Sequence, residues 1–139
     1  MPTNSSSPTS PRPRILLAED EPAFRDLLVE ALRGEGFDVV AAADGAEMIE
    51  LFSTHGPFDA LLLDEDMPGL KGRQALARLR SAGTLVPAVI CSGRLVMDRE
   101  ECVRLGVRFV LRKPCTLASL VSAVRATLGD RPSGPPSAR

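Results

Sequence analysis

The sequence predicts an α/β protein with a parallel β-sheet, built from five consecutive βα units. Short apolar runs alternate with segments of helical periodicity between residues 14 and 129. The apolar residues, 44% of the chain, are mainly aliphatic, because there are five Phe and no Trp or Tyr. Aliphatic strands are typical of a parallel sheet that is buried on both faces. A chain of 139 residues is long enough for one such domain.

The two ends differ in composition from the middle of the chain. Residues 1–13 and 130–139 are rich in Ser, Pro and Arg and contain almost no apolar residues. Such segments bury too little surface to offset the entropy that ordering costs. We therefore expect two disordered tails around one domain at residues 14–129.

The first βα unit is a strand at Ile15–Ala18 and a helix that begins at Pro22, a residue suited to a first helical turn. Gly34 and Gly36 end this helix. Apolar residues at helical spacing predict one stripe that faces the sheet: Phe24, Leu27, Leu28, Ala31 and Leu32.

The second unit is a strand from Asp38 to Ala43 followed by a helix entered at Asp44. Glu47 lies three residues after Asp44, which is the spacing of a capping box. Ile49 and Phe52 are the expected anchors on the inner face of this helix.

The third unit is a strand at Ala60–Leu63 and a helix at Lys71–Ser81, with Ala75, Leu76 and Leu79 facing inward.

The fourth unit begins with a strand at Val86–Cys91. Asp98 and Glu101 can cap a short polar helix, which Gly106 ends.

The fifth unit is a strand at Val107–Leu111 and a helix capped by Thr116. Apolar residues keep helical spacing along this helix: Leu117, Leu120, Val121, Val124 and Leu128.

Polar residues follow four of the predicted strands. Glu19 and Asp20 follow the first, Asp64 the third, Ser92 the fourth and Lys113 the fifth. The carboxyl ends of parallel strands are where open α/β sheets place their ligand sites. We expect these side chains to form one pocket.

The pocket chemistry suits a phosphoryl group and a hard cation. Clustered carboxylates need a positive partner, and their oxygens suit Mg²⁺. With its charge partly balanced, Asp64 can act as a nucleophile toward phosphorus. Lys113 can stabilise the phosphoryl oxygens, and Ser92 can donate a hydrogen bond to them.

Composition excludes several other classes. The formal charge is −1 and residues 15–129 carry more acidic than basic groups, so nucleic acid is not expected as a direct partner. Cys91, Cys102 and Cys115 have no zinc-ligand spacing and are expected to be small buried thiols in a reducing compartment. The sequence has neither an apolar run long enough for a membrane span nor a signal peptide, so we expect a cytoplasmic protein.

The segment LLLDEDMPGLKG, residues 61–72, closely resembles the phosphoacceptor signature of the receiver domains of two-component signalling. Glu19-Asp20 resembles the acidic pair of that family, Ser92-Gly93 its hydroxyl residue before a small one, and Lys113-Pro114 its Lys-Pro pair. Order and spacing agree from about residue 14 to residue 128.

This resemblance implies a flavodoxin-like (βα)5 three-layer sandwich with strand order 2-1-3-4-5. It implies Mg²⁺, or Mn²⁺, held by Asp20, Asp64 and the main-chain carbonyl of Asp66, with Glu19 acting through bound water. It also implies a cis Lys113–Pro114 bond. The resemblance further implies that a histidine kinase or a histidine phosphotransfer protein phosphorylates Asp64. The chain would then be a phosphoacceptor that is not itself an enzyme but assists its own phosphorylation and dephosphorylation.

The chain departs from the family at Val110, where receivers usually carry Tyr or Phe. Phe109 is adjacent but should point to the opposite face of its strand, into the core. We therefore expect the switch to run through Ser92 and the fourth helix, with Val110 at the aromatic position. Cys115 stands where many relatives have Phe, which we interpret as a packing variation.

Asp66 and Arg94, two residues past Asp64 and Ser92, should flank the route of water to the acyl phosphate. Their charges could pair, and we predict that they modulate hydrolysis. The alternative is that both are solvated charges of little effect.

Two alternative functions stay open, a small phosphohydrolase and a receiver-like interaction module that is never phosphorylated. Asp64-Glu65-Asp66 fits the Asp-x-Asp motif of haloacid-dehalogenase-type phosphatases. Those enzymes carry the motif after the first strand, whereas in this chain it follows the third predicted strand. No output domain is expected after Leu128, so output should occur by contact with an unknown protein, through the face of the fourth helix, fifth strand and fifth helix. The chain could be a stand-alone regulator or a receiver from a hybrid kinase, and a monomer or a phosphorylation-dependent dimer.

Overall fold

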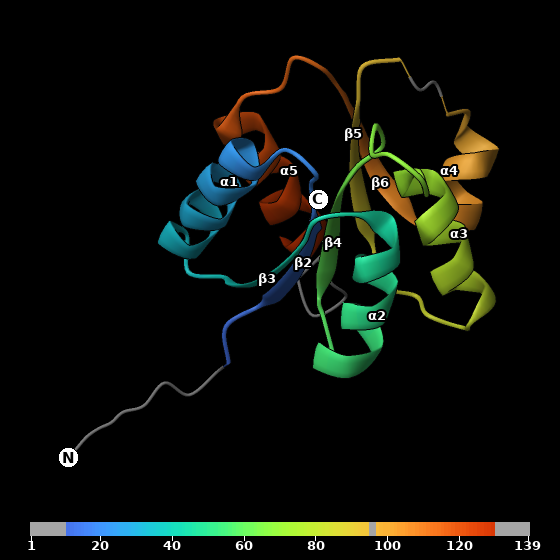
Figure 1. Cartoon of the computed structure of the whole chain (residues 1–139), viewed down its shortest axis with the longest axis horizontal. Coiled ribbons are helices and arrows are strands. Elements are labelled where there is room, and N and C mark those ends of the chain that lie inside the picture. The colour runs from blue at the N-terminus through green and yellow to red at the C-terminus, as the bar shows by residue number, and fades with distance from the viewer. Residues whose placement is uncertain (1–10, 95–96, 130–139) are drawn as a thin grey trace.

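The computed structural model describes residues 11–94 and 97–129 (Figure 1). The predicted tails therefore lie outside the described residues, apart from residues 11–13. Five parallel strands form one sheet in the order β3-β2-β4-β5-β6. This is the order 2-1-3-4-5 in chain sequence, so the prediction is confirmed. The strands are β2 (Arg14–Ala18), β3 (Asp38–Ala42), β4 (Ala60–Asp64), β5 (Ala88–Ser92) and β6 (Val107–Arg112).

Helices cover both faces of the sheet, which makes the predicted flavodoxin-like three-layer sandwich. Helices α1 and α5 lie on one side of it, and α2, α3 and α4 lie on the other (Figure 1). The helices are α1 (Pro22–Gly34), α2 (Gly45–His55), α3 (Gly72–Ser81), α4 (Arg99–Leu105) and α5 (Leu117–Gly129).

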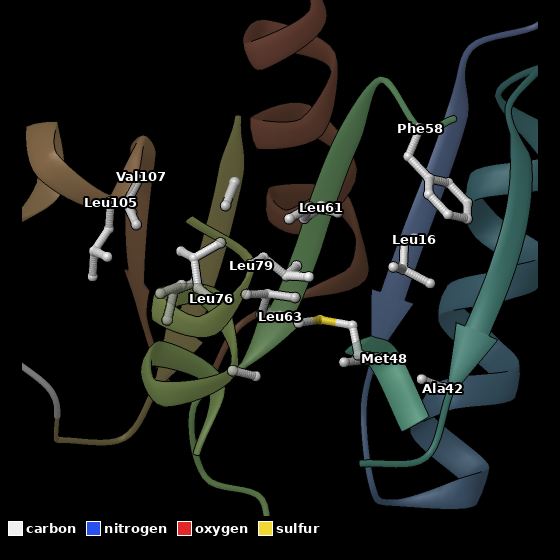
Figure 2. Close-up of a cluster of buried hydrophobic side chains, with 14 of the residues drawn as sticks. Leu16, Ala42, Met48, Phe58, Leu61, Leu63, Leu76, Leu79, Leu105 and Val107 are labelled. Carbon is white, nitrogen blue, oxygen red and sulfur yellow. The ribbon is translucent and has the colours of Figure 1, made fainter. Parts of the chain in front are cut away.

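The strands send alternate side chains into two separate cores. Leu16, Leu61 and Leu63 join the core under α2 and α3, whereas Ile15 and Leu17 join the core under α1 and α5. Figure 2 shows the first core, in which leucines of α3 meet leucines of β4. Each fully buried Leu stabilises the fold by about 1.5–3 kcal/mol, so the two cores fix the sheet between its helical layers.

The predicted helix caps are present. Asp44 accepts a hydrogen bond from the amide of Glu47 at 2.8 Å, and the Glu47 carboxylate accepts one from the amide of Ala43 at 2.7 Å. Asp98 caps α4, and Gly106 ends it in the left-handed conformation, with φ of 68°. Thr116 accepts from the amide of Ser119 at 3.0 Å at the start of α5. These short-range signals were therefore interpreted correctly.

The prediction was wrong for the position of Leu27, which is 48% exposed. The buried residues of α1 are Leu28 and Leu32. Relative to the predicted stripe, the helix is therefore rotated about its axis, which leaves Leu27 outside the contact with the sheet. In α2, Met48 is fully buried while Ile49 and Phe52 pack only partly against the core. Helical spacing predicts an apolar side but does not determine its centre.

Strand β5 begins two residues later than predicted, at Ala88. Pro87 has no backbone N–H and cannot donate to the ladder, although its carbonyl accepts from the amide of Leu61 at 2.9 Å. The strand also extends to Ser92, whose carbonyl accepts from the amide of Lys113 at 2.8 Å. No helix within residues 11–94 and 97–129 has the length and apolar content to span a membrane.

Candidate functional site

The predicted site residues lie together at the carboxyl edge of the sheet. Strands β2, β4, β5 and β6 are neighbours, and their registers pair Ala18 with Leu63, Asp64 with Cys91, and Ser92 with Arg112. The residues at or just after these positions therefore lie at one level of the sheet. This edge carries Glu19, Asp20, Asp64, Ser92 and Lys113, as the strand ends predicted.

An ion pair joins Asp64 to Lys113. The Nζ atom of Lys113 lies 2.8 Å from Oδ1 of Asp64, whose side chain is 3% exposed. Burial alone would lower the pKa of the Lys113 ammonium, but the hydrogen bond and charge of Asp64, reinforced by Asp66, outweigh it and raise that pKa. Lys113 is therefore a permanent positive charge beside the carboxylate.

Asp64 carries competing influences on its ionisation. Burial raises the pKa of its carboxyl, the hydrogen bonds from Lys113 and from the Asp66 amide lower it, and Asp20 raises it again. The net direction is upward. The amide of Asp66 donates to Oδ1 of Asp64 at 3.1 Å, which fixes the orientation of the side chain.

Three carboxylates meet in this site. One oxygen from each of Glu19, Asp20 and Asp64 lies within 4.8 Å of the others. Burial raises the pKa of Glu19 to about 6, the amide of Glu21 opposes this by donating to Glu19, and the charges of Asp64 and Asp20 add to the rise. This crowding of negative charge, with only oxygen donors, fits a hard divalent cation such as Mg²⁺.

Asp66 connects two loops. Its carboxylate lies 3.2 Å from Nζ of Lys113 and accepts a hydrogen bond from the amide of Gly93 at 3.0 Å. Burial would raise the pKa of Asp66, but the Gly93 amide and Lys113 lower it. Asp66 thus makes its ion pair with Lys113, where the sequence suggested Arg94.

Ser92 ends β5, and Arg94 follows it by two residues. Ser92 is buried, and its Oγ accepts a hydrogen bond from the amide of Arg94 at 3.1 Å. Arg94 is exposed. The Lys113–Pro114 bond is cis, as the resemblance implied.

A pocket of about 520 Å³ opens beside the ion pair. Its lining includes Glu19 and Lys113 together with apolar side chains from α1 and from the loop after β6, among them Phe24 and Pro114. A group as large as phosphate therefore has room next to Lys113.

Comparison with known proteins decides the family, since the family model described as "Response regulator receiver domain" matches residues 15–125. The chain belongs to this family. The transcriptional regulatory protein TrcR of Mycobacterium tuberculosis is 39% identical to this receiver domain over 116 residues, which is 83% of this chain and 45% of TrcR. PrrA of the same organism is 38% identical over 122 residues, or 87% of this chain and 52% of PrrA. The chain thus spans about half the length of these curated relatives.

Solved structures of receiver domains are similar to this chain over most of its length. The response regulator TrrA of Thermotoga maritima, solved in complex with Mg²⁺-BeF, has a TM-score of 0.70 and 27% identity, and the match covers 84% of this chain and 99% of TrrA. The receiver domain of the Francisella response regulator 1452 has a TM-score of 0.73 and 27% identity, covering 84% and 97% of the two chains.

Phe109 and Val110 of this receiver domain lie on opposite faces of β6, as predicted. Phe109 packs against the core under α1 and α5, whereas Val110 packs against the core under α2 and α3. Both are partly buried. Phe109 is therefore on the wrong face to take the position of the aromatic residue that Val110 replaces.

No sequence pattern predicted the role of Glu65. This buried side chain accepts a hydrogen bond from the amide of Arg73 at 2.7 Å, and so satisfies the N-terminus of α3. Burial raises the pKa of Glu65, while the Arg73 amide and charge lower it. Glu65, the residue after Asp64, therefore joins the end of β4 to the start of α3. This contact depends on tertiary packing.

Gly72 is required by a close approach of α3 to the site. A Cβ atom at Gly72 would lie 2.6 Å from the carbonyl oxygen of Asp64. Because that oxygen belongs to the backbone, any larger residue would have to displace either the helix or Asp64. The glycine in the phosphoacceptor signature thus fixes where α3 begins.

Proposed function

We propose that this receiver domain accepts a phosphoryl group on Asp64 from a histidine kinase or a histidine phosphotransfer protein. The observation that carries the proposal is the 2.8 Å ion pair of Lys113 with a buried Asp64, next to Glu19 and Asp20. A structural carboxylate would not need three further charged groups around it. A buried carboxylate held beside a cation, with further acids around it, supports a nucleophilic role for Asp64.

The cation that the acidic cluster would hold is Mg²⁺, with Mn²⁺ as a substitute. Asp20 and Asp64 would bind it directly, together with the main-chain carbonyl of Asp66, and Glu19 would bind through water. When bound, the cation would offset the acidic charge and neutralise phosphoryl oxygens during transfer. The structure of the relative TrrA in complex with Mg²⁺-BeF supports this assignment.

The remaining steps belong to side chains of this chain. An oxygen of Asp64 attacks the phosphorus atom, the bond from phosphorus to the donor histidine nitrogen breaks, and an acyl phosphate forms on Asp64. Lys113 moves from the carboxylate to the new phosphoryl oxygens, and the hydroxyl of Ser92 donates to them. The chain thus assists its own phosphorylation, and assists hydrolysis by the same contacts.

The signal would leave the site through the segment after Ser92. Phosphorylation adds a charge of about −1.5 to −2. The phosphoryl group would draw the Ser92 hydroxyl toward it and so shift the backbone that follows Ser92. No aromatic side chain would change rotamer, because the position that carries the aromatic residue in other receivers is Val110 here. The output surface is the face formed by α4, β6 and α5, which binds a downstream protein.

Phosphotransfer profiling tests the donor. Each histidine kinase of the source cell is labelled on its histidine and mixed with this chain, and a cognate kinase should transfer its label within seconds while others transfer slowly. The phosphohydrolase alternative requires turnover of a phosphate ester such as p-nitrophenyl phosphate, which we expect to be absent. A chain that no kinase labels and that also turns over an ester would refute the proposal.

A further inference from the structure

Two cysteines share the pocket beside Lys113. Cys91, on β5, and Cys115, on the loop before α5, both line the 520 Å³ pocket with Lys113 and Glu19. Both belong to the core under α1 and α5, whereas Cys102 packs against the core on the opposite face of the sheet. The sheet therefore separates Cys102 from the pair.

The two thiols share one environment, because both line the same pocket and pack in the same core. Burial raises the pKa of the Cys91 thiol, and the neighbouring thiol of Cys115 adds to that rise. Cys115 is the more exposed of the two, and its Sγ donates to the carbonyl of Arg112 at 3.3 Å. All three cysteines are free thiols in the structure.

Each of these cysteines is attached to a residue of the phosphoryl site. Cys91 directly precedes Ser92, and Cys115 follows Lys113 by two residues. A covalent link between them would join the end of β5 to the loop that follows β6. It would therefore restrain the two side chains that must move toward a phosphoryl group.

We propose that Cys91 and Cys115 form a dithiol site that hydrogen peroxide oxidises to a disulfide, beside the phosphoacceptor. The sulfur of Cys115, open to the pocket, attacks one peroxide oxygen, the O–O bond breaks, and Cys115 becomes a sulfenic acid with release of water. The sulfur of Cys91 then attacks the Cys115 sulfur, loses its proton and displaces a second water. Two thiols are oxidised, one peroxide is reduced to two waters, and a dithiol reductant reverses the reaction.

Peptide mapping tests the site without reference to phosphorylation. The full chain is treated with hydrogen peroxide, its remaining thiols are alkylated, and it is digested with trypsin. Cys91 lies in the tryptic peptide 81–94, Cys115 in 113–125 and Cys102 in 100–104. We expect peptides 81–94 and 113–125 to be linked, and to separate on reduction, while Cys102 stays alkylated.

Matched variants keep this test specific. Cys102→Ser should still give the link, whereas Cys115→Ser and Cys91→Ala should both abolish it. Links that involve Cys102 as often as the other two would overturn the proposal, as would full alkylation of Cys91 and Cys115 after peroxide treatment of the folded chain.

The regulatory consequence rests on the proposed function. Peroxide-treated chain should take up a phosphoryl group from an acyl phosphate at least about tenfold more slowly than reduced chain, because small misplacements of reacting groups cost that much or more. Reduction should restore the rate, and Cys115→Ser should be insensitive to peroxide. An equal rate in linked and reduced chain would overturn this regulatory role. Failure of the reduced chain to react would instead count against Asp64 as acceptor, and the peptide map would still decide the dithiol site.

Discussion

The carboxylate of Asp66 accepts a hydrogen bond from the amide of Gly93 at 3.0 Å, which ties the loop after β4 to the loop after β5. The same carboxylate lies 3.2 Å from Nζ of Lys113. The residue two positions past the phosphoacceptor therefore holds both the lysine and the segment that follows Ser92. If a phosphoryl group recruits Lys113 and Ser92, both contacts of Asp66 should rearrange. Asp66 therefore connects the lysine of the phosphoryl site to the backbone through which we propose that the signal leaves.

Asp66→Ala should shorten the lifetime of the acyl phosphate. Loss of the Gly93 hydrogen bond should free the backbone just after β5 and admit water to Asp64, and a contribution of about 1 kcal/mol corresponds to a roughly fivefold faster hydrolysis. Arg94→Ala should also change the lifetime, because we expect the exposed Arg94 side chain to flank the same route. The decay of labelled protein after removal of the donor measures both, and unchanged decay in both variants would end the modulating role.

Lys113→Ala should slow phosphorylation by about a hundredfold, the usual effect of removing one group that stabilises a charged transition state. The only other lysine in the sequence, Lys71, is exposed at the start of α3 and gives a matched control. Rates of uptake from an acyl phosphate, followed by intact mass, compare the two. Equal loss in Lys71→Ala would show that the effect is not specific to the site.

Glu19 should make stability depend on pH in the absence of divalent cations. Its pKa of about 6 in the folded chain exceeds the ordinary 4.5, so the native state binds the proton more tightly and stability falls as pH rises from about 4.5 to about 6. Glu19→Gln should remove this loss, and so stabilise the chain at pH 7 by up to about 2 kcal/mol.

Urea unfolding in EDTA at pH 4.5 and pH 7 measures this effect, with Glu30→Gln on the exposed side of α1 as the control. In Mg²⁺, wild type should be more stable than Glu19→Gln, because the cation stabilises the acidic wild type more than the variant. A Glu19→Gln variant that is no more stable than wild type at pH 7 would contradict the crowding of charge.

Arg80 should be worth far more to stability than its neighbour on α3. Its half-buried guanidinium donates to the carbonyl of Leu105, at the end of α4, at 2.7 Å, and to the carbonyls of Thr84 and Val86. Arg80→Met leaves these carbonyls without donors and should cost about 2–3 kcal/mol. The exposed Arg78→Met should cost at most about 0.5 kcal/mol. Urea unfolding of the two variants decides this, and similar values would show that Arg80 does not anchor α4.

Gly72→Ala should disturb Asp64 through the backbone. The added Cβ would lie 2.6 Å from the Asp64 carbonyl oxygen, and such overpacking typically costs about 1–3 kcal/mol. Phosphorylation should slow as well, because Asp64 shifts. Gly34→Ala is the control, since nothing lies within 4 Å of its added Cβ. Equal stability and equal uptake in both variants would contradict the close approach.

Short-range signals predicted most of this fold, and strand ends predicted which residues share the edge. Asp64 and Lys113 are far apart in the chain, but parallel strands bring their carboxyl ends together whatever the loop lengths. The rotation of α1 that exposes Leu27 depends on how the helix packs on the sheet. The same holds for the burial of Glu65 at the start of α3 and for the pocket that Cys91 and Cys115 share. None of these has a local pattern, so sequence reasoning missed them.

The partner of Asp66 illustrates the same limit. Sequence spacing placed Asp66 and Arg94 on two neighbouring loops, which suggested an ion pair between them. In the structure the nearer cation is Lys113, and the amide of Gly93 takes the other contact. Spacing locates loops, but side-chain geometry selects the partners within them.

Phosphoryl uptake measured by intact mass decides whether Asp64 is the acceptor. Wild type and Asp64→Asn are incubated with an acyl phosphate donor, with Mg²⁺ or with EDTA, and their intact masses are measured. We predict that wild type with Mg²⁺ gains one phosphoryl group, and that neither the EDTA sample nor Asp64→Asn gains any. Wild type that stays unmodified in Mg²⁺, or Asp64→Asn that is modified equally, would rule out Asp64 as the phosphoacceptor.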